Sequence, residues 1–81
     1  MTNWIAVEVS EGLFPNERIV QLNTVEGEIS FFVSPGLLDE NMSRLRVELL
    51  DEDSQFALVQ VPSQGGIRVA KVVKQELIVA P

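Results

Sequence analysis

The chain of 81 residues contains no cysteine, no histidine and no tyrosine. Without cysteine it cannot form a disulfide framework, a zinc–thiolate site or an iron–sulfur cluster. Without histidine it lacks an imidazole base, a Ser–His–Asp triad and a histidine-based metal site. We therefore expect a protein that is not an enzyme, with no catalytic residue, no cofactor and no metal ligand.

Long apolar runs are missing as well. No unbroken apolar run exceeds four residues, as in Trp4 to Val7, whereas a membrane-spanning helix needs about 20. Glu8 and Glu11 interrupt the apolar core that a secretory signal would need. These absences favour a cytoplasmic protein with no membrane partner.

The length and a hydrophobic fraction of 46% suit one globular domain covering residues 1–81.

Basic side chains are scarce. Six lysines and arginines stand against twelve acids, for a net charge of −6. A surface of that sign repels phosphate backbones, so we expect no nucleic-acid partner. Residues 1–40 hold seven acids and one base, whereas residues 41–81 hold five of each. This uneven charge fits either an ordinary solvated surface or a basic strip that docks on an acidic partner.

Strand signals dominate what is present. Valine, isoleucine and threonine account for 19 residues, and these β-branched types favour pleated surfaces. Alternating apolar and polar positions predict strands at 3–9, 17–24, 28–33, 44–49, 55–61, 67–73 and 77–79. Gly27 suits the positive φ of a hairpin turn, and Ser34-Pro35-Gly36 interrupts the sheet ahead of a helical turn over residues 37–41. A short 3₁₀ turn is expected at residues 74–76.

One segment has a competing interpretation. Apolar side chains fall at helical spacings between Leu38 and Leu49, through Met42 and Leu45. Val47 breaks that helical stripe, and an apparent hairpin follows at the acidic turn of residues 51–54. We therefore favour a strand over residues 44–49.

These elements predict an all-β fold, a small single-domain barrel of five to seven short antiparallel strands. The order of strand, long loop, three-stranded meander, then a strand leading to a short turn and a terminal strand resembles the layout of a Src-homology-3-like (SH3-like) barrel. An oligonucleotide-binding-like (OB-like) barrel and a small sandwich are the alternatives. The predicted core residues are Val7, Leu22, Phe31, Val47, Leu58 and Val69.

Two short segments resemble ligand-binding motifs but have simpler structural explanations. The run Asp51-Glu52-Asp53 lacks the glycine and the later glutamate of a calcium loop, so we interpret it as a solvated hairpin turn. Gly65-Gly66 lies between strands and lacks the lysine of a phosphate-binding loop, so it is interpreted as a flexible connection.

A few aromatic and basic residues fall outside the core pattern. Trp4 and Phe32 lie on the face opposite the main apolar stripe of their strands, and Phe14 lies in the first loop. Exposed aromatic side chains often mark protein contacts. With Arg44 and Arg46 these form the predicted protein-binding residues of a small binding or accessory protein, whose partner is another protein or a second copy. A structural subunit that works as a homo-oligomer or within a larger assembly is the alternative.

Overall fold

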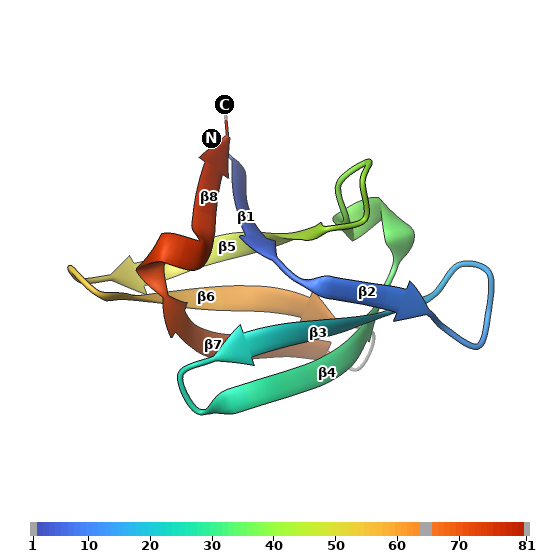
Figure 1. Cartoon of the computed structure of the whole chain (residues 1–81), viewed down its shortest axis with the longest axis horizontal. Coiled ribbons are helices and arrows are strands. Elements are labelled where there is room, and N and C mark those ends of the chain that lie inside the picture. Colours follow the sequence, from blue (N-terminus) through green and yellow to red (C-terminus); the bar gives the residue numbers. More distant parts are fainter. Residues whose placement is uncertain (1, 64–65, 81) are drawn as a thin grey trace.

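The computed structural model describes residues 2–63 and 66–80, which form two antiparallel sheets (Figure 1). The five-stranded sheet has the order β7-β6-β5-β1-β8, and the three-stranded sheet has the order β2-β3-β4. The strands are β1 (Thr2–Ala6), β2 (Glu8–Glu11), β3 (Arg18–Thr24), β4 (Gly27–Val33), β5 (Arg44–Glu52), β6 (Phe56–Ser63), β7 (Gly66–Val73) and β8 (Leu77–Ala80). Two 3₁₀ turns, η1 (Pro35–Leu37) and η2 (Lys74–Glu76), are the helical segments of the described residues. The all-β prediction is confirmed.

The first predicted strand divides between the two sheets. Residues 3–9 alternate like one strand, but Val7 interrupts the ladder and its N–H donates to the carbonyl of Ser43 over 3.0 Å. Consequently β1 pairs with β5 and β8, whereas β2 pairs with β3. This division accounts for the eighth strand, since the other six predicted strands each match one observed strand.

The expected barrel is not closed. Within residues 2–63 and 66–80, no ladder connects the three-stranded sheet to the five-stranded one. The Val25 N–H in the β3–β4 turn donates to the Lys71 carbonyl on β7 over 2.9 Å and so links the two sheets. Gly27 has φ +124° in that turn, as the hairpin prediction required.

Residues 44–52 form a strand, which excludes the competing helix. Leu45 and Val47 are buried while Arg44, Arg46 and Glu48 are exposed, a period of two that places the arginines in water. The helical turn predicted at residues 37–41 is displaced, because the turn ends at Leu37 and Leu38 already bridges to Leu45. Proline at the start of η1 follows Ser34, where its missing N–H leaves no intrahelical hydrogen bond unmade.

Among the residues that the structure describes, one apolar core lies between the inner faces of the sheets. Leu22, Phe31 and Val47 belong to it as predicted, and Val7 is half-buried against it. The full set is Ile5, Val20, Leu22, Phe31, Val33, Leu38, Leu45, Val47, Ala57, Val59, Val61, Ala70 and Val72.

Two core predictions are wrong. Leu58 and Val69 point outward, with exposed fractions of 37% and 53%, while their neighbours Val59 and Ala70 point inward. Both registers of β6 are largely apolar, so counting apolar residues does not separate them. The observed register, with Val59 and Ala70 facing the core, leaves Lys71 in water on the outer face, opposite Leu58. The strand also runs through Pro62 to Ser63, where a loop was expected.

No helix in the described ranges is both long and apolar enough to cross a membrane.

Candidate protein-binding surface

Three of the five predicted binding residues share the outer face of the five-stranded sheet. Trp4 on β1 lies directly opposite Arg46 on β5, and Ala6 lies opposite Arg44. Residues opposite each other in an antiparallel pair project to the same side. Trp4 is half-buried, with Ile78 opposite it on β8, and both arginines are exposed. The structure therefore brings one aromatic ring and two cations onto one surface.

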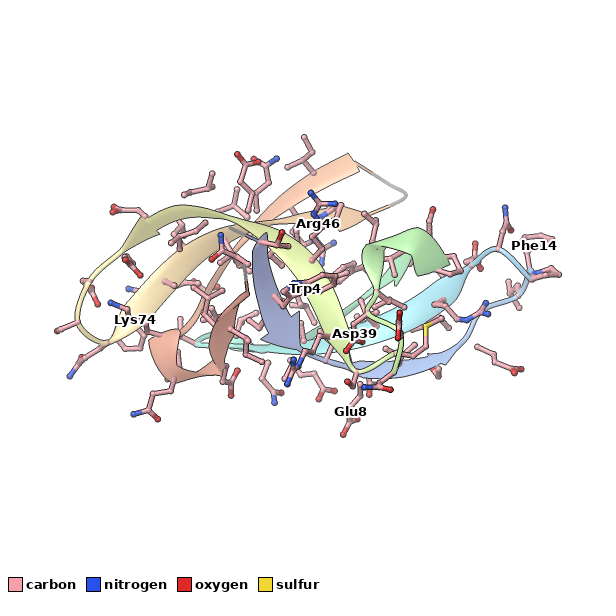
Figure 2. All side chains as sticks on the ribbon, turned by 90° about the horizontal axis from the view of Figure 1, so that it is seen from above. Trp4, Glu8, Phe14, Asp39, Arg46 and Lys74 are labelled. Carbon is pink, nitrogen blue, oxygen red and sulfur yellow. The ribbon has the colours of Figure 1, made fainter. Side chains whose placement is uncertain are left out.

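The other two predicted residues belong to the three-stranded sheet. Phe32 on β4 is 40% exposed and lies opposite Ile19 on its outer face. Phe14 is 63% exposed in the loop between β2 and β3, and Figure 2 shows it at one end of the molecule, well away from Trp4 and Arg46. Trp4, Arg44 and Arg46 therefore share one sheet, whereas Phe32 and Phe14 belong to the other, on β4 and in the β2–β3 loop.

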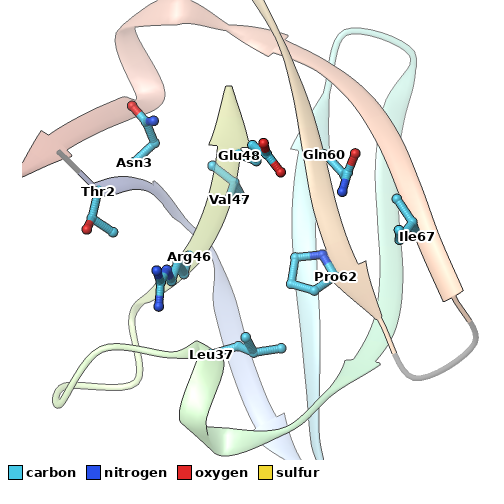
Figure 3. Close-up of a pocket in the computed structure, with 9 residues that line it drawn as sticks. All are labelled: Thr2, Asn3, Leu37, Arg46, Val47, Glu48, Gln60, Pro62 and Ile67. Atoms are coloured by element: carbon cyan, nitrogen blue, oxygen red, sulfur yellow. The ribbon is translucent and has the colours of Figure 1, made fainter. Parts of the chain in front are cut away.

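A hollow of about 500 Å³ lies beside Arg46 (Figure 3). The ladder between β5 and β6 ends at the pair Glu48–Gln60, and two residues further on β6 carries Pro62. Proline has no N–H to donate to a neighbouring strand, so pairing with β5 is not favoured at this point. We call this site the Arg46 hollow. Its lining residues are Thr2, Asn3, Leu37, Arg46, Val47, Glu48, Gln60, Pro62 and Ile67.

The rim of the hollow continues into an apolar strip along β6 and β7. Ile67 is 72% exposed and lies opposite Pro62, Val69 lies opposite Gln60, and Leu58 lies opposite Lys71. The sequence pattern does not single out Ile67 as a surface residue, and Val69 was predicted to lie in the core. Each face of β7 carries one cation, since Lys71 shares the face of Val69 and Arg68 shares the face of Ala70, so charge did not separate the two registers.

The loop between β2 and β3 holds a second exposed apolar group, Leu13 and Phe14, which we call the tip. Leu13 is 83% exposed. The buried Glu17 closes the loop, since its Oε1 accepts from the Leu13 N–H at 3.1 Å and its N–H donates to the Phe14 carbonyl at 3.1 Å. The Arg18 guanidinium donates to the carbonyls of Pro15 and Glu17 at 2.9 and 2.8 Å. The tip is therefore held on a constrained support.

Close packing inside this loop depends on glycine at position 12. A Cβ there would stand 2.8 Å from the Glu17 Oε1 and 2.9 Å from the Glu17 backbone oxygen. The Gly12 N–H also donates to that same Glu17 carbonyl over 3.2 Å. Only glycine allows this approach without moving the backbone.

The acidic run at residues 51–53 belongs to a hairpin turn, as interpreted from the sequence. Asp53 Oδ1 accepts from the N–H groups of Phe56 and Gln55, each at 2.7 Å. These backbone donors, that of Phe56 first, hold the pKa of Asp53 below its usual value. In the part of the chain that the structure describes, no three acidic side chains are grouped so that they could hold a metal ion.

Asp39 plays the same role in the turn before β5. Its carboxylate accepts from the N–H groups of Ser43 at 2.8 Å and Arg44 at 3.0 Å. The Ser43 N–H is the main reason that the pKa of Asp39 is lowered. This turn fixes the start of β5 and so positions Arg44 and Arg46 on the outer face.

No family model matches the chain, no curated protein matches it, and no solved structure matches its fold.

Proposed function

We propose that this chain is a small non-catalytic binding protein that acts through protein–protein contacts, with the Arg46 hollow and its apolar rim as the binding surface. The observation that carries the proposal is the gathering of large exposed apolar side chains beside a hollow that an arginine lines. Interface centres are enriched in aromatic side chains and arginine, and Trp4 opposite Arg46 supplies both.

The finer fold description is also a proposal. The meander β5–β6–β7, the η2 turn and the return of β8 to pair with β1 support an SH3-like layout. The chain differs in that the strands β2, β3 and β4, which come between β1 and β5 in the sequence, form a separate sheet. An SH3-like layout supplies a scaffold and no function of its own.

The experiment compares capture of proteins from the native host by three forms of the chain. Ile67→Ser removes an apolar side chain from the hollow rim, and Leu50→Ser removes one that is 45% exposed on β5 and does not line the hollow. The proposal expects a defined protein that wild type and Leu50→Ser recover equally and Ile67→Ser recovers at least about tenfold less. Equal recovery of every protein by all three forms would refute it.

The alternative is a structural subunit that works as a homo-oligomer. It is favoured by the presence of two distinct exposed apolar groups, the tip and the hollow rim, on one small domain. Light scattering on the purified chain separates the two, since a stable oligomer of fixed mass supports the structural role.

A further inference from the structure

We draw no further inference here: the strongest candidate, the exposed apolar Leu13–Phe14 tip of the loop between β2 and β3, is flanked in the sequence by the acid Glu11 and the base Arg18, so its charge selects no partner, and nothing in the structure shows what covers it.

Discussion

Replacing Phe31 with alanine should remove a large part of the stability of the fold. Phe31 is 7% exposed and points from β4 into the core, where Val20 lies opposite it on β3. Truncating a buried phenylalanine costs about 3–5 kcal/mol of unfolding free energy. A chain of this length has roughly 4–12 kcal/mol in total. The variant should therefore be marginal or largely unfolded at room temperature.

Phe32 is the matched control, since it is the same residue type one position along the same strand. It is 40% exposed on the outer face, so its truncation should cost less than about 1.5 kcal/mol. Urea unfolding followed by circular dichroism measures both. With a slope near 1 kcal/mol per molar for so small a domain, Phe31→Ala should lower the midpoint by about 3 M or more. A larger loss for Phe32→Ala than for Phe31→Ala would show that β4 has the opposite register, and the assigned core would then be wrong.

Three further predictions concern the loop, the turns and the charge. Gly12→Ala should lower the unfolding free energy by about 1–2 kcal/mol, because its Cβ meets the Glu17 carboxylate and backbone at under 3 Å; a thermal melt identical to wild type would contradict this packing. Backbone N–H donors lower the pKa values of Asp39 and Asp53 in the folded protein below their ordinary value of 3.8. The stability that these two carboxylates add is therefore present above pH 4 and is lost as pH falls through their folded-state pKa values. Melting temperatures between pH 5 and pH 2 should therefore fall less steeply for Asp53→Ala than for wild type, and parallel curves would count against it. With a net charge of −6, the chain should not shift DNA or RNA on a gel at physiological salt, and submicromolar binding would overturn the charge argument.

The sequence predicts the fold best where alternation is chemically unambiguous. In β5 the outward positions are Arg44, Arg46 and Glu48, so only one register keeps charge in water, and the strand and its faces are confirmed. In β6 and β7 both registers are mostly apolar, and the two core residues predicted in these strands, Leu58 and Val69, point outward. The division at Val7 has no local signal, because it depends on Ser43, which is 36 residues away along the chain.

The candidate surface was harder to predict than the fold for a related reason. Periodicity identifies residues that depart from a strand's apolar face, and it correctly singled out Trp4 and Phe32 as outward-facing. It does not say which outward faces adjoin, since that depends on how the two sheets pack. It also gives no register within a loop, so Leu13 was not distinguished from its neighbours. The hydrogen bonds of Glu17 within its own loop create the tip, and the departure of β6 from β5 creates the hollow. Both surfaces arise where regular pairing between strands ends, so neither follows from the alternation within one strand. Large exposed apolar side chains often mark contact surfaces, and the capture and light-scattering experiments test whether these do.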